Sequence, residues 1–301
     1  MLLKSFTSLI FLALFLEHEL VLAQVLTVRT VGGRVELVVS SDRKDVGYQI
    51  ERSLDFWDWV GGFGHSVGSH TVSIPSDEAQ SAFYRLNIWQ LREDEISMAL
   101  IGDSTIMDFS YYSGRVGGWG EGFGAHFNDQ VILVNLAQPG QSTKTYLESG
   151  WQVQNLKFVA ADFVFIQFGM IDELSGQPEK RTTMEVYRAN LATLVELVRG
   201  FGGTPVLVTP LTLRQFDSGG TPVPYLDERS DAVLEVAQSL GCPSIDVNRL
   251  TKQLYQDLGE EASDGFTHTD RLHLVAPGAK VISKQVADNV PEFLKAYRVL
   301  D

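Results

Sequence analysis

The sequence predicts an α/β protein, with a three-layer α/β/α domain on a parallel sheet that is preceded by a small β-sandwich. Two patterns predict this architecture. From residue 95 onward, short apolar runs alternate with helical stretches over roughly 200 residues, which is typical of a parallel sheet with helices on both faces. Between residues 24 and 94, short apolar or alternating runs are separated by Gly, Ser, Asp and Pro, which is typical of antiparallel strands.

Residues 1–23 have the order of an export signal. Lys4 precedes an apolar run at residues 9–16, and the small-residue site Val21-Leu22-Ala23 follows, so cleavage is expected before Gln24. The apolar run is shorter than a spanning helix needs, which makes a membrane anchor the weaker alternative. We therefore expect a secreted or periplasmic protein with no stable membrane insertion after signal cleavage.

The net charge bears on the possible partners of the protein, and the cysteine content bears on the source of its stability. The formal net charge is −14, and such an acidic chain repels phosphate backbones, so no nucleic-acid partner is expected. Export would favour disulfides, but Cys242 is the single cysteine, so stability must come from the hydrophobic core.

The β-module is assigned to residues 24–94. Its predicted strands lie at residues 25–28, 35–39, 48–51, 71–74 and 83–86. Trp57, Trp59 and Phe63 would suit a sugar-stacking platform, although burial in the module's own core is the commoner use of tryptophan. Gly64-His65-Ser66-Val67-Gly68 matches the G-x-S-x-G elbow of hydrolases, but β-like residues follow it, which predicts a hairpin loop instead.

The α/β/α domain is assigned to residues 95–301. Its predicted strands lie at residues 98–101, 131–136, 163–168, 206–208 and 244–247, and its clearest helices at residues 184–199, 227–240 and 275–297. The glycine cluster at residues 117–124 lacks the Lys-Ser/Thr of a phosphate-binding loop and does not follow a strand, so it is interpreted as a loop that leads into a helix.

Ser104 is the candidate nucleophile. The apolar strand before it ends at Gly102, which places Ser104 at the carboxyl edge of the sheet, where open α/β sheets carry their chemistry. A serine after a strand is often only a helix cap. Here, however, Asp270 and His273 near the end of the chain supply the carboxylate and the imidazole base that a nucleophilic serine needs.

These motifs together resemble the SGNH or GDSL hydrolases and, among them, the rhamnogalacturonan acetylesterases. The matching blocks are residues 102–105, 135–142, 165–169 and 270–274. The acetylesterase branch is suggested by Gly118-Trp119-Gly120, Glu148-Ser149-Gly150-Trp151 and Arg214-Gln215-Phe216. The resemblance runs from about Ser97 to the end of the chain and implies a flavodoxin-like order of strands.

The resemblance implies a serine carbohydrate esterase that removes acetyl groups from a rhamnogalacturonan- or pectin-like polysaccharide. In this interpretation Ser104 attacks the ester, His273 transfers the proton and Asp270 orients the imidazole. The N–H groups of Ser104 and Gly140 form the oxyanion hole. No metal or cofactor is expected, and specificity is assigned to the loops at residues 107–115 and 214–225.

Several alternatives remain open. His268 is a rival for the base, and His268, Asp270 and His273 could together ligate a metal. The resemblance also implies an asparagine oxyanion donor where this chain has Ile171, and losing one donor costs roughly 3 kcal/mol of transition-state stabilisation. The competing functions are therefore a catalytically impaired carbohydrate-binding protein of the same fold and a broad-specificity GDSL esterase or lipase.

Overall fold

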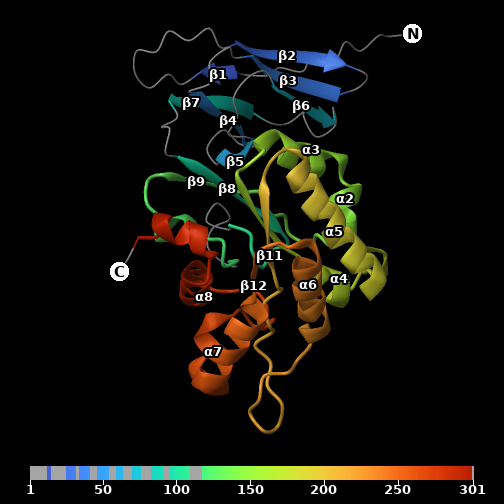
Figure 1. Cartoon of the computed structure of the whole chain (residues 1–301), viewed down its shortest axis with the longest axis vertical. Helices are drawn as coiled ribbons and strands as arrows, with labels where there is room; N and C mark the ends of the chain where they lie inside the picture. The colour runs from blue at the N-terminus through green and yellow to red at the C-terminus, as the bar shows by residue number, and fades with distance from the viewer. Residues whose placement is uncertain are drawn as a thin grey trace, which may run out of the picture. The chain divides into compact units, whose positions relative to one another are not determined.

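The computed structural model describes residues 95–108 and 117–299, without the side chain of Phe158, together with the backbone of seven strands before residue 95 (Figure 1). The chain divides into two compact units, Met1–Glu93 and Asp94–Asp301.

The first unit contains two β-sheets. One has the order β1-β7-β4-β5, and the other has the order β2-β3-β6. Every pair is antiparallel except β1 with β7. The strands are β1 (Leu12–Leu14), β2 (Val25–Val31), β3 (Arg34–Ser40), β4 (Val46–Ser53), β5 (Trp59–Phe63), β6 (His70–Pro75) and β7 (Phe83–Gln90).

All five strand segments predicted between residues 24 and 94 are strands in the structure. Strand β1 lies inside the segment predicted as an export signal. Trp57 and the Gly64–Gly68 motif lie outside the described residues, and only the backbone of Trp59 and Phe63 is described. The prediction of a hairpin loop there is wrong: β5 before the motif pairs with β4, and β6 after it pairs with β3 in the other sheet, so the two flanking strands do not form a hairpin.

The second unit is built on a five-stranded sheet of order β12-β11-β10-β8-β9. Every neighbouring pair is parallel, which confirms the predicted fold class and its flavodoxin-like strand order. Strand β8, which leads to Ser104, lies between two neighbours in the sheet. The strands are β8 (Ile96–Gly102), β9 (Val131–Asn135), β10 (Phe163–Gln167), β11 (Thr204–Val208) and β12 (Ser244–Ile245).

Alternate side chains of the central strands enter two separate cores. Met98 and Leu100 pack with Trp119 and with residues of α7 and α8, whereas Ala99 and Ile101 pack with residues of α2, α3, α5 and α6. Figure 1 shows these two groups of helices on opposite sides of the sheet. Because both faces are covered, the strands are apolar throughout, which is why they appear as continuous apolar runs in the sequence.

Helices α2 to α6 lie between successive strands of this unit, whereas α7 and α8 follow its last strand. They are α2 (Thr143–Glu148), α3 (Gly150–Val159), α4 (Met170–Leu174), α5 (Met184–Gly200), α6 (Asp227–Leu240), α7 (Val247–Ala262) and α8 (Ala276–Asp288). Short 3-10 turns lie at η1 (Phe123–His126), η2 (Pro178–Lys180), η3 (Asp264–Phe266) and η4 (Glu292–Tyr297).

Two of the differences between predicted and observed bounds have a clear physical cause. The helix predicted over residues 275–297 is divided into α8 and η4, because Pro291 has no N–H to continue a helix and restricts the residue before it. The strand predicted over residues 244–247 ends at Ile245, because the side chain of Asp246 accepts a hydrogen bond from the N–H of Arg249 and caps α7.

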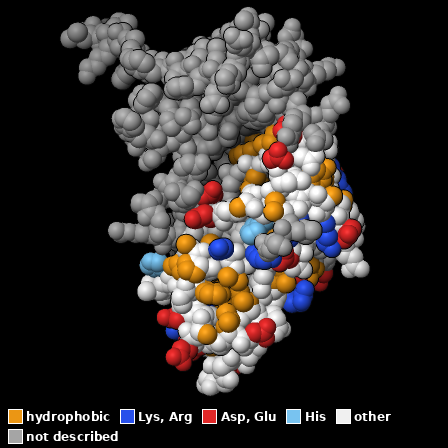
Figure 2. Space-filling view, turned by 90° about the vertical axis from the view of Figure 1, so that its left-hand side faces the viewer, with side chains coloured by type: hydrophobic (Ala, Val, Ile, Leu, Met, Phe, Trp, Pro, Cys, Tyr) orange, Lys and Arg blue, Asp and Glu red, His pale blue; other side chains and the backbone are white. Residues whose placement is uncertain are grey.

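No helix of the described part combines the length and the apolar character needed to cross a bilayer. On the face shown in Figure 2, hydrophobic, acidic and basic side chains are interspersed, and histidine side chains reach the surface.

Candidate active site

Ser104 lies in a tight turn directly after β8 and is 4% exposed. The turn is held by Asp103, whose Oδ1 accepts hydrogen bonds from the N–H (2.8 Å) and the hydroxyl (2.7 Å) of Thr105. Gly102 is required by the close approach of β10, because a Cβ there would lie 2.2 Å from the carbonyl oxygen of Gln167. The local sequence therefore fixes the backbone that carries the hydroxyl.

A buried chain of polar contacts lies beneath this turn. Trp119 Nε1 donates to Gln167 Oε1, and Gln167 Nε2 donates to the hydroxyl of Thr105, each at 2.7 Å. Burial raises the pKa of Asp103 to about 6, although both hydrogen bonds from Thr105 oppose the shift. Asp103 Oδ2 is buried without a hydrogen-bond partner, which is consistent with a carboxyl that ionises reluctantly.

His273 bridges the nucleophile and a carboxylate. Its Nε2 lies 2.8 Å from Ser104 Oγ, and its Nδ1 lies 2.7 Å from Asp270 Oδ2. When Nδ1–H donates to the carboxylate, Nε2 is left as the acceptor for the serine hydroxyl. The structure thus brings the three residues predicted as nucleophile, base and orienting acid into one line of hydrogen bonds.

Asp270 and His273 belong to a short loop at residues 267–274, here called the histidine loop, between η3 and α8. Asp270 Oδ1 accepts hydrogen bonds from the N–H groups of Leu272 and His273, both at 3.0 Å. Partial burial favours the neutral acid, but the hydrogen bonds from His273 and Leu272 outweigh it and hold the pKa of Asp270 below its usual value. The carboxylate is therefore ionised wherever His273 must act as a base.

Arg214 anchors the histidine loop from the neighbouring segment. It is 4% exposed, its Nη2 pairs with Asp264 at 2.7 Å, and its Nε donates to the hydroxyl of Thr267 at 3.0 Å. Its backbone N–H also donates to the carbonyl of Arg271 at 2.9 Å. Arg214, which begins a predicted specificity loop, therefore positions the base. Residues 109–115 of the other predicted loop lie outside the described residues.

The rival base, His268, does not contact Ser104. Its Nδ1 lies 3.3 Å from the hydroxyl of Thr269, and its side chain is exposed. Within the described residues, no three histidine, cysteine or acidic side chains converge in a way that could hold a metal ion. His273 is thus the histidine whose geometry suits proton transfer with Ser104.

The candidate oxyanion donor Gly140 lies in a second loop, at residues 136–142, here called the glycine loop. This loop runs beside the end of β8, because the N–H of Gln138 donates to the carbonyl of Gly102 at 3.0 Å. Gly140 has a φ of 71°, in the left-handed region that favours glycine. Ile171 lies in α4, next to Asp172, and its side chain has no hydrogen-bond donor.

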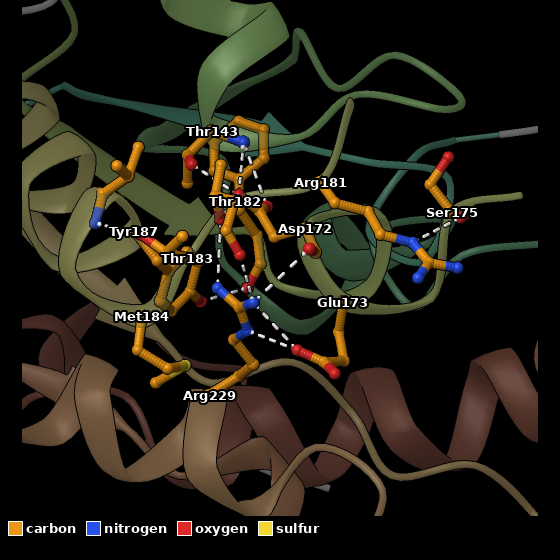
Figure 3. Close-up of polar contacts among 12 residues, drawn as sticks. Thr143, Asp172, Glu173, Ser175, Arg181, Thr182, Thr183, Met184, Tyr187 and Arg229 are labelled. Carbon is orange, nitrogen blue, oxygen red and sulfur yellow. Dashed lines mark hydrogen bonds and ion pairs between the residues drawn. The ribbon is translucent and has the colours of Figure 1, made fainter. Parts of the chain in front are cut away.

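Asp172 ties α4 to Thr143, the residue directly after the glycine loop, a connection that sequence reasoning missed. This fully buried carboxylate accepts hydrogen bonds from the N–H (3.0 Å) and the hydroxyl (2.6 Å) of Thr143, and from the hydroxyl of Thr182 (2.8 Å) (Figure 3). Burial raises the pKa of Asp172, against the hydrogen bonds from both threonines and the charge of Arg229.

Arg229 completes this buried network from α6. Its guanidinium donates to the carbonyl of Thr182 at 2.6 Å, pairs with Glu173 at 2.8 Å and lies 4.8 Å from the ring centre of Tyr187 (Figure 3). The hydroxyl of Tyr187 in turn donates to the carbonyl of Phe168 at 2.7 Å. The network holds the carboxyl end of β10 and the segments around α4 in fixed positions relative to each other.

Comparisons with known proteins agree with this geometry. Residues 100–281 match the model of the GDSL-like lipase/acylhydrolase family. The rhamnogalacturonan acetylesterase RhgT of Bacillus subtilis is 31% identical over 214 residues, which are 65% of this chain and 90% of the relative. The probable rhamnogalacturonan acetylesterase YesY of the same organism is 27% identical over 205 residues, which are 64% of this chain and 91% of the relative.

Solved structures share the fold. The protein YXIM of Bacillus subtilis aligns with a TM-score of 0.64 and 18% identity, over 87% of this chain and 84% of its own. The acetylxylan esterase Axe2 of Geobacillus stearothermophilus aligns with a TM-score of 0.53 and 18% identity, over 69% of this chain and 98% of its own. At these identities the likeness shows the fold alone. On the family match and the curated relatives, this chain belongs to the GDSL-like lipase/acylhydrolase family and is a serine hydrolase that cleaves esters.

Proposed function

We propose that this protein is an exported carbohydrate esterase that removes acetyl groups from a rhamnogalacturonan- or pectin-like polysaccharide. The observation that carries the chemistry is the line of two hydrogen bonds from Asp270 through His273 to Ser104. The names of the curated relatives, both rhamnogalacturonan acetylesterases, support the choice of substrate. The export signal expected at residues 1–23 agrees with a polymer that is met outside the cell.

The reaction proceeds in two halves. Ser104 Oγ attacks the acetyl carbonyl carbon while His273 Nε2 takes the hydroxyl proton, and the N–H groups of Ser104 and Gly140 donate to the oxyanion. His273 then gives the proton to the departing sugar oxygen, which leaves an acetyl ester on Ser104. A water molecule, deprotonated by His273, attacks this ester, and His273 returns the proton to Ser104 Oγ as acetate departs. Asp270 stays ionised and stabilises the imidazolium in both halves.

Two competing functions make different predictions. A catalytically impaired carbohydrate-binding protein is suggested by Ile171, which supplies no donor to the oxyanion. A broad-specificity esterase or lipase of the same fold would hydrolyse short aryl esters and acetylated polymers without preference. Substitution of Ile171 by Asn separates the first from a weakened enzyme, since only an enzyme gains rate from an added oxyanion donor.

The test is acetate release by the purified chain from a panel of substrates: acetylated rhamnogalacturonan, acetylated xylan and 4-nitrophenyl acetate. We expect release from the rhamnogalacturonan to be the fastest among the polymers, and the Ser104→Ala variant to release none. Equal rates on both polymers would favour the broad esterase. If neither the wild type nor the Ile171→Asn variant releases acetate from any substrate, the binding protein is favoured.

A further inference from the structure

The ammonium of Lys180 lies directly against the glycine loop. Its Nζ donates a hydrogen bond of 3.2 Å to the carbonyl oxygen of Gly140. It also lies 3.4 Å from the position that a Cβ on Gly140 would take. Because Gly140 has no side chain, the ammonium contacts the face of the loop that a side chain would otherwise cover. A positive charge therefore sits beside the residue whose N–H is the candidate oxyanion donor.

The fold holds Lys180 in this place by independent contacts. Lys180 ends η2, and its neighbour Glu179 accepts a hydrogen bond of 2.8 Å at its carbonyl from Lys144 Nζ at the start of α2. On the other side, the backbone N–H of Thr182 donates to the carbonyl of Asp172 at 3.1 Å. Asp172 also binds Thr143, the residue directly after the glycine loop. The segment that carries Lys180 is thus tied to the segment that carries Gly140.

The charge of Lys180 is not neutralised by an acid in the part of the chain that the structure describes. Other lysines there form ion pairs, as Lys252 does with Asp227 and Lys284 with Asp288. Lys180 is half-buried, and among the described residues its ammonium donates a hydrogen bond to a neutral carbonyl, which engages one of its three N–H donors. A partly desolvated ammonium without a counter-ion favours a negative charge that forms close by.

The ammonium of Lys180 is close enough to the expected position of the oxyanion to stabilise it electrostatically. The amide nitrogen of a residue lies about 2.5 Å from its own Cβ position, so Lys180 Nζ is within about 6 Å of the nitrogen of Gly140. An oxyanion that accepts from that N–H lies about 3 Å further, hence at most about 9 Å from the ammonium. This separation is shorter than the screening length of about 10 Å at moderate salt, and the site is partly shielded from water.

We propose that Lys180 stabilises the oxyanion electrostatically and takes over part of the role of the donor that Ile171 cannot supply. The inference rests on the proposed esterase function, and it assigns Lys180 as a positioning residue that acts through its charge and through the glycine loop. It explains how a serine hydrolase of this family works with an apolar side chain at residue 171. It also predicts that Lys180 and residue 171 are coupled.

The test compares variants in the hydrolysis of 4-nitrophenyl acetate, a small substrate with no charged group. Lys180→Met removes the charge and keeps the length of the side chain, and Ile171→Asn is made alone and together with it. Lys144→Met is the matched control, because Lys144 also donates to one backbone carbonyl of the same segment. Thermal unfolding of each variant shows whether it folds, and binding of phenylboronic acid, which adds to Ser104 as a tetrahedral anion, reports on oxyanion stabilisation.

We expect Lys180→Met to lower kcat roughly tenfold or more with little change in KM, and to weaken boronate binding by a similar factor. Lys144→Met, which removes one contact of the segment but leaves the charge of Lys180 in place, should lower kcat and weaken boronate binding much less. Ile171→Asn should restore the rate of Lys180→Met by a larger factor than it raises the rate of wild type, since the two groups serve the same charge. Lys180→Arg, which keeps the charge, should retain most of the activity.

Three results would overturn the proposal. An active wild type whose Lys180→Met and Lys144→Met variants are equally fast would overturn this inference alone. A loss confined to KM on acidic polysaccharide would show that Lys180 binds a substrate carboxylate instead. A wild type with no activity on any ester would overturn the proposed function and this inference with it.

Discussion

Asp270→Asn is the substitution that isolates the role of the carboxylate from the role of the loop. The two backbone N–H groups that Asp270 Oδ1 accepts can be satisfied by the amide oxygen of asparagine, so the histidine loop keeps its shape. The amide NH₂ then faces His273 Nδ1, which must act as an acceptor. In that tautomer Nε2 carries the proton and cannot accept the hydroxyl hydrogen of Ser104.

The expected loss follows from this wrong tautomer and from the missing negative charge beside the imidazolium. Together they are expected to lower kcat about 10⁴-fold, which is roughly 5.5 kcal/mol of transition-state stabilisation. The free energy of unfolding at neutral pH should fall much less, because the Asp270 side chain is nearly half exposed. Its lowered pKa stabilises the folded state at neutral pH, and this contribution is lost as the pH falls below about 4.

The assay is the steady-state hydrolysis of 4-nitrophenyl acetate between pH 5 and pH 9, with thermal unfolding measured in parallel. Asp288→Asn is the control, because Asp288 also has a lowered pKa and lies on the opposite end of α8 from the histidine loop. The control should keep the wild-type rate. An Asp270→Asn variant that keeps more than roughly a tenth of the wild-type kcat would refute the assigned role of the carboxylate.

Two further predictions concern the buried charges around the site. Asp103→Asn keeps the acceptor for Thr105 and removes the titrating carboxyl. Because burial raises the pKa of Asp103 from 3.8 to about 6, the folded wild type should lose stability relative to the variant as the pH rises from about 4 to about 6. The difference in the free energy of unfolding between variant and wild type should level off at about 3 kcal/mol above that range. Urea unfolding at several pH values measures it, and a difference that does not change with pH would contradict the reasoning. Arg229→Ala leaves Asp172 and the carbonyl of Thr182 without their cation, so the free energy of unfolding in urea should fall by about 3 kcal/mol or more. A fall of less than about 1 kcal/mol would contradict the structural role of this network.

Much of the fold can be predicted from the sequence because the patterns that indicate its strands and helices are local. The apolar runs that became β8, β10 and β11 are buried on both faces, so they appear without interruption. Helix α5 shows its amphipathic period and its Thr183 cap directly. Helix α7 is amphipathic as well, but it is polar on average and follows a strand of only two residues, so its start is marked by the cap at Asp246 and not by an apolar run before it.

The candidate site divides in the same way. Ser104, Asp270 and His273 stand in short motifs whose chemistry is visible from residue types and spacing. The residues that support them do not stand in recognisable motifs. Asp172 meets Thr143 across 29 positions, and Arg214 meets Asp264 across 50, so their contacts exist only once the sheet has brought the loops together. Lys180 belongs to this second group, since its sequence surroundings give no sign of the Gly140 carbonyl.

The central claim is that Ser104 forms a covalent acetyl ester during turnover, with His273 as its base. It is tested most directly by mixing the wild-type protein with 4-nitrophenyl acetate, quenching in acid and locating added acetyl groups by peptide mass spectrometry. The mechanism predicts one acetyl group on the peptide that contains Ser104, and none on that peptide in Ser104→Ala. An active wild type that carries no acetyl group there, or a Ser104→Ala variant that still releases acetate at the wild-type rate, would contradict it.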